Sequence, residues 1–208
     1  MTSQKPLCVD LDGTLLPIDT LHEALILLIK KLPLSIFLMI LWLFRGKAYF
    51  KLQVFKRVQL NYDLIPKNQP LCDWLLTQKQ QGRELILVSA TDEKNAEAAK
   101  NAFNLFDDVI SSTDKINLSG GNKAKALVDR YGAKGFDYVG NAKPDIAVWR
   151  QADKAVINSK SNRFIQSVRS DKNIVTEKVF QTSTNYPKKI IKALRVHQWV
   201  KKDRKSVV

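Results

Sequence analysis

The sequence has few cysteines, one long stretch without acidic residues, and no apolar run long enough to span a bilayer. Its 208 residues include only Cys8 and Cys72, which is too few for a disulfide framework and predicts a reducing compartment. Residues 1–6 lead directly into an apolar run, so we expect no secretory signal peptide. A chain of this length predicts one domain, or a core with one sizeable insertion.

The positive charge of the chain is concentrated in two segments. The formal net charge is +14 at pH 7, and residues 24–62 contain seven Lys or Arg residues but no Asp or Glu. Residues 178–208 contain nine Lys or Arg residues and one Asp, so the rest of the chain is close to neutral. Basic segments suit partners that carry phosphate, such as nucleic acid, anionic lipid or a phosphorylated substrate. We expect no nucleic-acid partner, because exposed aromatic residues are not interleaved with the basic ones and no binding motif is present.

Short apolar strands alternate with helical stretches along most of the chain. The strands are expected at residues 7–11, 85–89, 108–112, 136–140 and 154–158, and helices at 93–104, 123–131 and 145–151. This alternation predicts an α/β fold with a Rossmann-like parallel sheet sandwiched by helices. Ligands of such sheets bind at the carboxyl edge of the strands.

Residues 17–82 interrupt the alternation. The segment is too long for one crossover, and its pattern is helical between breaks at Pro33, Gly46, Pro66 and Pro70. We therefore expect a helical cap over 17–82, inserted after the first strand. The remaining layout is a core of residues 1–16 and 83–180, followed by a basic tail at 181–208.

Residues 32–44 of this expected cap are apolar throughout except for Ser35. Thirteen residues are too few to span a bilayer, which takes about 20. One interpretation is a helix buried within the cap. The other is an interfacial helix lying on a membrane, which the basic flanks Lys30, Lys31 and Arg45 favour.

The most informative motif is CVDLDGTL at residues 8–15. Residues i and i+2 of a strand point to the same side, so Asp10 and Asp12 can converge at the end of the first strand. Gly13 lets the chain turn away sharply. Paired carboxylates at this position suit a divalent cation and a phosphate. The structural alternative is a strand that runs into an Asp-rich turn.

Three later positions fit the acidic pair. Ser89 ends an apolar strand, where its hydroxyl could donate to a phosphate oxygen, although the stretch could also be a helix N-cap at Thr91. Lys123 starts a helix, where a solvated lysine is the simpler alternative. Asn141 and Asp145 follow another strand, in a stretch that could equally form an ordinary Asn-Ala-Lys-Pro turn.

In this order, the four motifs resemble those of the haloacid dehalogenase (HAD) superfamily of phosphohydrolases, over roughly residues 7–158. The resemblance implies a phosphatase (phosphoric monoester hydrolase) with Asp10 as nucleophile and Asp12 as general acid and base. It implies that Ser89 and Lys123 hold the phosphoryl group.

The same resemblance implies a Mg²⁺ site formed by Asp10, Asp12, Asn141 and Asp145. The commoner superfamily pattern has Asp where this chain has Asn141, and an amide binds Mg²⁺ without a formal charge. Metal affinity and activity are therefore expected to be lower. A catalytically weak regulatory or docking module, which binds a phosphorylated headgroup or partner, is the alternative function that Asn141 favours.

A closer resemblance is to the HAD domains fused to UbiA-type prenyltransferases. It is carried by the cap, by DTLHE at 19–23, by DIAVWR at 145–150 and by LRVHQWVK at 194–201. It implies a lipid-linked sugar phosphate or prenyl phosphate as substrate, with a small soluble phosphate monoester as the nearest variant. It further implies a separate prenyltransferase partner, an anionic membrane surface, and a cytoplasmic location at the inner face of the membrane.

Overall fold

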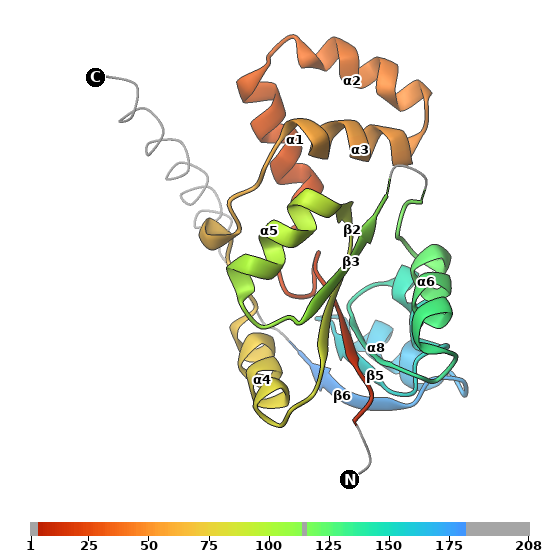
Figure 1. Cartoon of the computed structure of the whole chain (residues 1–208). Coiled ribbons are helices and arrows are strands. Elements are labelled where there is room, and N and C mark those ends of the chain that lie inside the picture. Colours follow the sequence, from red (N-terminus) through yellow and green to blue (C-terminus); the bar gives the residue numbers. More distant parts are fainter. Residues whose placement is uncertain (1–3, 114–115, 182–208) are drawn as a thin grey trace.

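The computed structural model describes residues 4–113 and 116–181. Most of the basic tail expected over 181–208, including residues 194–201, lies outside the described residues. Within the described part, the elements form one parallel sheet with helices on both faces and a projecting helical unit at one end (Figure 1).

The sheet has six parallel strands in the order β3-β2-β1-β4-β5-β6. The strands are β1 (Leu7–Asp10), β2 (Leu85–Asp92), β3 (Asp108–Ser112), β4 (Asp137–Gly140), β5 (Ala155–Asn158) and β6 (Thr176–Phe180). The sequence pattern predicts the first five. β6 was not expected, because an edge strand half exposed to water carries Glu177 and Lys178 in place of an apolar run.

Alternate side chains of the strands enter two separate apolar layers, as the period of two requires. The layer over one face is covered by α4 (Gln69–Gln80) and α5 (Glu93–Phe103). The layer over the other is covered by α6 (Gly121–Tyr131), α7 (Ile146–Trp149), which follows the 3₁₀ turn η2 (Lys143–Asp145), and α8 (Asn162–Arg169). The predicted Rossmann-like sheet sandwiched by helices is confirmed.

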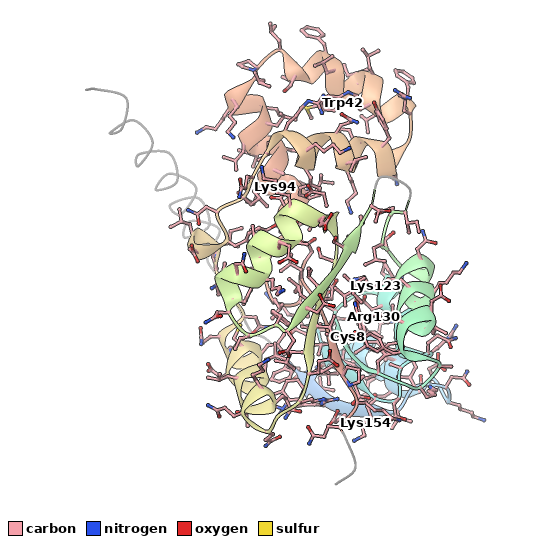
Figure 2. The ribbon with its side chains drawn as sticks, viewed as in Figure 1. Cys8, Trp42, Lys94, Lys123, Arg130 and Lys154 are labelled. Carbon is pink, nitrogen blue, oxygen red and sulfur yellow. The ribbon has the colours of Figure 1, made fainter. Side chains whose placement is uncertain are left out.

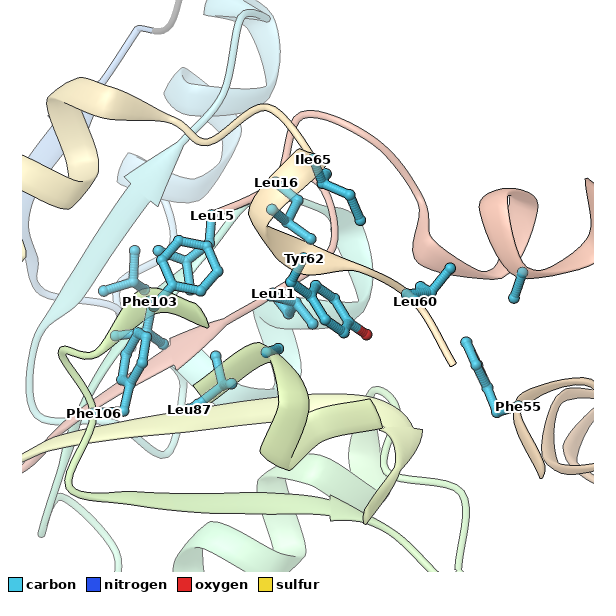
Figure 3. Packing of buried hydrophobic residues seen from close by; sticks show 14 of the residues in the cluster. Leu11, Leu15, Leu16, Phe55, Leu60, Tyr62, Ile65, Leu87, Phe103 and Phe106 are labelled. Atoms are coloured by element: carbon cyan, nitrogen blue, oxygen red, sulfur yellow. The ribbon is translucent and has the colours of Figure 1, made fainter. Parts of the chain in front are cut away.

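Three helices follow β1 and form the projecting unit, here called the cap helices: α1 (Thr20–Lys31), α2 (Ser35–Phe44) and α3 (Lys47–Arg57). They share one buried cluster with the sheet, joined through η1 (Tyr62–Leu64). Figure 3 shows Tyr62 beside Leu11, with Phe55 of α3 facing Leu60. The cap is thus anchored by the same apolar core that supports the end of β1.

The helical segment expected over 17–82 contains two kinds of helix. α4, its last helix, packs on the sheet through the buried residues Leu71 and Leu75, and the Trp74 ring lies 5.5 Å from that of Phe180 in β6. The projecting unit of the structure therefore ends with α3 at Arg57, because α4 buries its apolar face against strands and not against the other cap helices.

The buried-helix interpretation of residues 32–44 is wrong for most of the segment. In α2 only Ser35 and Trp42 are buried, whereas Phe37, Leu41 and Phe44 are 69%, 60% and 84% exposed. The reason is geometric, because a helix in the outer layer of a three-helix cap has neighbours on one side only.

A buried ion pair braces the amino edge of the sheet. Arg83, just before β2, and Asp137, at the start of β4, are 5% and 4% exposed and form a salt bridge. Arg83 also donates to the Lys5 carbonyl (2.9 Å), and Asp137 accepts from the Lys154 amide (2.8 Å; Lys154 is labelled in Figure 2). Burial raises the pKa of Asp137, with the Arg83 charge opposing.

We expect Arg83→Met to lower the free energy of unfolding by about 3–5 kcal/mol, because it leaves Asp137 buried and unpaired. Adding Asp137→Asn should restore part of the loss. Urea unfolding monitored by circular dichroism would measure both. Arg130→Met is the matched control, since Arg130 pairs with Asp108 at the surface and exposed pairs contribute about 0–1 kcal/mol. Equal losses in the Arg83 and Arg130 variants would contradict the bracing role.

Candidate active site

The predicted site residues follow the carboxyl ends of the central strands. Asp10 is the last residue of β1, and its strand neighbours are Val88 of β2 on one side and β4 on the other. After Asp12 the backbone turns through Gly13, whose φ of +74° disfavours other residues. The turn is held by the Asn158 side-chain amide, which donates to the carbonyls of Gly13 and Thr14.

Asp10 and Lys123 form a buried ion pair, although 113 positions separate them in the sequence. Lys123 lies in the first turn of α6, is 4% exposed, and donates to Asp10 Oδ1 over 2.5 Å (Figure 2). Thr14 Oγ1 donates to the other oxygen, Oδ2, over 3.0 Å. The interpretation of Lys123 as a solvated lysine is therefore wrong, and Asp10 is held in one orientation.

Tyr138 links this pair to Asp145. Its hydroxyl accepts from Lys123 Nζ (3.0 Å) and donates to Asp145 Oδ1 (2.9 Å). The sequence analysis missed Tyr138 and Thr14 as site residues. A signal existed for Tyr138: it pairs with Cys8 in the sheet, so it shares a face with Asp10 two residues on, and a buried tyrosine needs a partner for its hydroxyl.

The site is buried and carries more negative than positive charge, and both features affect the pKa values of Asp10, Lys123 and Tyr138. Burial raises the pKa of Asp10 to about 6; the Lys123 ammonium opposes this shift, and the carboxylates of Asp145 and Asp12 add to it. Burial alone would lower the pKa of Lys123, but Asp10 and Asp145 outweigh it, so the pKa is raised. Burial and the Asp145 carboxylate raise the pKa of Tyr138. Lys123 therefore stays charged and Tyr138 neutral at physiological pH.

Asp12 connects the site to the cap helices. Its Oδ1 accepts from the backbone N–H of Thr20, the first residue of α1, over 2.9 Å. Burial raises the pKa of Asp12, while the Thr20 bond and the positive charge of Lys51 on α3 oppose the shift. A raised carboxyl pKa favours the protonated form that a general acid needs near neutral pH.

Asn141 and Asp145 lie where the Asp10–Asp12 turn approaches the end of β4. A Cβ on Gly13 would meet the Asn141 side-chain amide at 2.1 Å, so this amide lies directly against the turn. Asp145 Oδ2 accepts from the backbone N–H groups of Asn141 (2.9 Å) and Ala142 (3.0 Å). Asp145 therefore fixes the loop that presents Asn141, and a glycine at 140 allows this approach, since a Cβ there would lie 2.7 Å from Asp145 Cγ.

Ser89 is buried in β2, one residue beyond Val88, the strand neighbour of Asp10. Its Oγ accepts from the Thr91 backbone N–H over 3.2 Å. The alternative of a helix N-cap at Thr91 is wrong, because β2 continues to Asp92 and that residue is the N-cap of α5. The contacts thus join Asp10, Lys123 and Asp145 into one network. Ser89 contacts Thr91 instead, and strand register sets Val88, not Ser89, opposite Asp10.

The oxygen donors of the turn are of the chemical type that Mg²⁺ binds. In the described part of the chain, no three His, Cys, Asp or Glu side chains are grouped so that they could hold a metal. Magnesium does not need such a group, since it usually takes one or two carboxylates and retains several waters. Asp10 and Asp12 would supply the carboxylates, and a pocket of about 250 Å³ lined by Gly13, Asn141 and Asn158 lies alongside.

No family model matches the chain. It is 28% identical over 197 residues to an uncharacterized protein, y4nM, of Sinorhizobium fredii strain NGR234. The match covers 94% of this chain but only 38% of that protein, so the chain spans well under half the length of this relative.

Solved structures with a similar fold include a HAD-family hydrolase and several phosphatases. A HAD-family hydrolase from Salmonella enterica serovar Typhi matches with a TM-score of 0.55 and 16% identity, over 83% of this chain and 68% of that one. A substrate-bound phosphoserine phosphatase matches at 0.56 and 12%, over 93% and 99%. A putative phosphoglycolate phosphatase from Lactobacillus delbrueckii matches at 0.54 and 15%, over 85% and 95%. The chain therefore has the fold of HAD phosphatases.

Proposed function

We propose that the chain is a Mg²⁺-dependent phosphohydrolase that cleaves a phosphate monoester through an aspartyl-phosphate on Asp10. The observation that carries this proposal is the buried Asp10–Lys123 pair at the carboxyl edge of the sheet, two residues from Asp12. A carboxylate that is fixed and desolvated beside a permanent cation is suited to attack an anionic phosphoryl group. Two of the structural neighbours are named as phosphatases, which supports the proposal.

In the proposed reaction, an Asp10 oxygen attacks phosphorus and the bond from phosphorus to the ester oxygen breaks. Asp12 gives its proton to that departing oxygen, then takes one from the water that hydrolyses the aspartyl-phosphate and restores Asp10. Lys123 neutralises charge on the equatorial phosphoryl oxygens, and Ser89 would donate to one of them. Magnesium, when bound, would be held by Asp10, Asp12, Asn141 and Asp145 and would reduce the repulsion between two anions.

The substrate is expected to enter between the cap helices and the sheet. A pocket of about 230 Å³ lies there, lined by Arg45 and Lys51 of the cap and by Ala90 and Ser112 of the core, among others. Ala90 directly follows Ser89, the residue to which the sequence resemblance assigns a phosphoryl contact. Two basic side chains, Arg45 and Lys51, and one carboxylate, Asp92, line the pocket. The small excess of positive charge suits a leaving group with further negative charge. The lipid-linked substrate and the prenyltransferase partner implied by the sequence resemblance stay predictions.

Hydrolysis assays on a panel of phosphate monoesters test the proposal. The panel should contain sugar phosphates, amino-acid phosphates and prenyl phosphates, each measured with Mg²⁺ and with EDTA. We expect turnover that EDTA abolishes, and acid-quenched protein should carry one phosphoryl group on the peptide that contains Asp10. No turnover of any ester, together with saturable binding of a phosphorylated compound, would favour the docking module. Asn141 favours that alternative, because the commoner superfamily pattern has a carboxylate at this position.

Asn141→Asp is expected to lower the Mg²⁺ concentration that gives half-maximal activity or binding, because it adds a charged ligand for a hard cation. Magnesium titration by calorimetry would measure the change. Asn173→Asp is the matched control: it adds the same charge to an exposed loop before β6, at the opposite edge of the sheet. If both variants bind Mg²⁺ like the wild type, Asn141 does not contact the metal.

A further inference from the structure

α2 presents an apolar surface to solvent where a surface helix normally carries polar residues. The inner stripe of the helix, Ser35, Met39 and Trp42, faces α1 and α3, and Arg57 of α3 stacks on the Trp42 ring at 4.5 Å. The exposed large side chains of this segment are Leu32, Leu34, Ile36, Phe37, Leu38, Ile40, Leu41, Leu43 and Phe44. We call this set the apolar face.

The apolar face lies on the outer side of the cap helices. α2 packs on α1 and α3, and α3 in turn packs on β2. In Figures 1 and 2, α2 lies at the far end of the cap from the sheet, and its side chains project away from the other helices. Soluble monomers rarely expose contiguous apolar patches larger than about 300–600 Å², and larger patches mark sites of interaction.

Basic side chains border the apolar face at both ends of α2. Lys30 and Lys31 end α1, Arg45 directly follows α2, and Lys47 begins α3; all four are exposed. No Asp or Glu occurs anywhere in residues 24–62. An apolar surface with a cationic border complements a bilayer with anionic headgroups, in which acyl chains take the apolar residues and the headgroups take the cations.

We infer that α2 inserts into the surface of an anionic membrane as an interfacial helix. Ten residues extend only about 15 Å, half of a hydrocarbon core of about 30 Å, so α2 would lie in the plane of the membrane. The described residues include no helix long and apolar enough to cross a bilayer. The inference does not depend on the proposed phosphatase activity.

A second copy of the chain fits this surface less well. A two-fold interface would set each apolar face against its twin and bring together two sets of Lys30, Lys31, Arg45 and Lys47. The cap has no acidic side chain over residues 24–62 to neutralise them. An anionic lipid surface removes this repulsion, whereas a copy of the same chain adds to it.

Flotation of the full chain with lipid vesicles tests the inference. We expect binding to vesicles of phosphatidylglycerol and phosphatidylcholine, and much weaker binding to phosphatidylcholine alone. Salt should weaken the binding only in part, since exposed charges are screened beyond about 10 Å at 0.1 M and about 3 Å at 1 M, while the apolar contribution persists. Equal binding to both vesicle types, or to neither, would overturn the inference.

The double variant Phe37→Ser/Leu41→Ser removes two exposed side chains one helical turn apart. We expect at least about tenfold weaker binding to anionic vesicles and unchanged hydrolysis of a soluble monoester. Leu76→Ser/Val175→Ser is the matched control, because these residues are also exposed but lie on α4 and before β6. Every variant keeps the basic residues of 182–208, so a difference between the two reports on α2. Equal binding by both would overturn the inference.

An environment-sensitive dye on Leu41→Cys distinguishes insertion from adhesion by charge. Cys8 and Cys72 are buried, so the introduced thiol is the reactive one in native protein. We expect a blue shift when anionic vesicles are added, and no shift for the same dye on Leu76→Cys. A blue shift that grows with protein concentration without lipid, with a dimer in sedimentation analysis, would show that a second copy covers the face and would overturn the inference.

Discussion

Asp10→Asn is expected to lower the rate of ester hydrolysis by a factor of about 10⁴ or more, because an amide cannot form the aspartyl-phosphate. The substitution nearly preserves volume, and its amide oxygen can still accept from Lys123 or Thr14. Steady-state hydrolysis of the best ester from the panel would measure the loss. Asp129→Asn is the matched control, since Asp129 is an exposed carboxylate on α6. Wild-type turnover by Asp10→Asn would show that another residue is the nucleophile.

The same variant has a second expected effect, on stability in EDTA. The pKa of Asp10 is raised from an ordinary 3.8 to about 6, so the folded protein holds a proton that the unfolded chain has released between these values. The wild type should therefore lose stability as pH rises from about 4 to above 6. At roughly 1.4 kcal/mol per pKa unit, the loss is on the order of 3 kcal/mol.

Asp10→Asn should lack this pH-dependent loss, and urea unfolding at a series of pH values would show it. Parallel stability profiles for the wild type and the variant would mean that Asp10 does not titrate in this range. The measurement separates a folded but inactive variant from one that has lost activity by unfolding.

The ends of the central strands were predictable from local sequence. Asp10 and Asp12 are two residues apart after a short apolar run, and this spacing sets them at the end of β1 whatever the rest of the chain does. The five apolar strands likewise predict a parallel sheet. β6 and α8 were not predicted from the sequence, because they lie at the edge of the sheet, where half of each element faces water and no long apolar run is needed.

The network around Asp10 was only partly predictable. Lys123 has no local sign that it is buried, and its pairing with Asp10 depends on β4 and α6 lying beside β1. Tyr138 becomes a site residue for the same reason, because strand register sets it beside Cys8. Contacts across 113 positions follow from topology, which a local pattern does not encode.

The sequence did not decide whether α2 is buried or exposed, and the reason is a different one. A helix that is apolar all round is consistent with burial in a core or with contact with lipid. Composition is the same in the two cases, and only the position of the helix in the cap differs. The exposure of Phe37 and Leu41 excludes burial in a core formed by the described residues.

Asp12→Asn is expected to lower the hydrolysis of alkyl phosphates by a factor of about 10²–10⁴, the usual contribution of a general acid or base. The amide oxygen can still accept from the Thr20 N–H, so the contact between the turn and α1 should persist. The decisive comparison is between leaving groups. A nitrophenol leaves as a stable anion and needs no proton, so its release in the first step should be nearly as fast as in the wild type.

The second step still needs Asp12 to take a proton from water, whatever ester was used. With nitrophenyl phosphate, the variant should therefore release a burst of nitrophenol equal to the enzyme concentration and then turn over slowly, while the aspartyl-phosphate accumulates. With an alkyl ester no burst should appear, because the first step is then slow. Stopped-flow absorbance would record the burst, and mass analysis of quenched protein the accumulated intermediate. Slow release of nitrophenol without a burst would show that Asp12 acts only through metal or substrate binding and not in proton transfer, and the acid would have to be another residue.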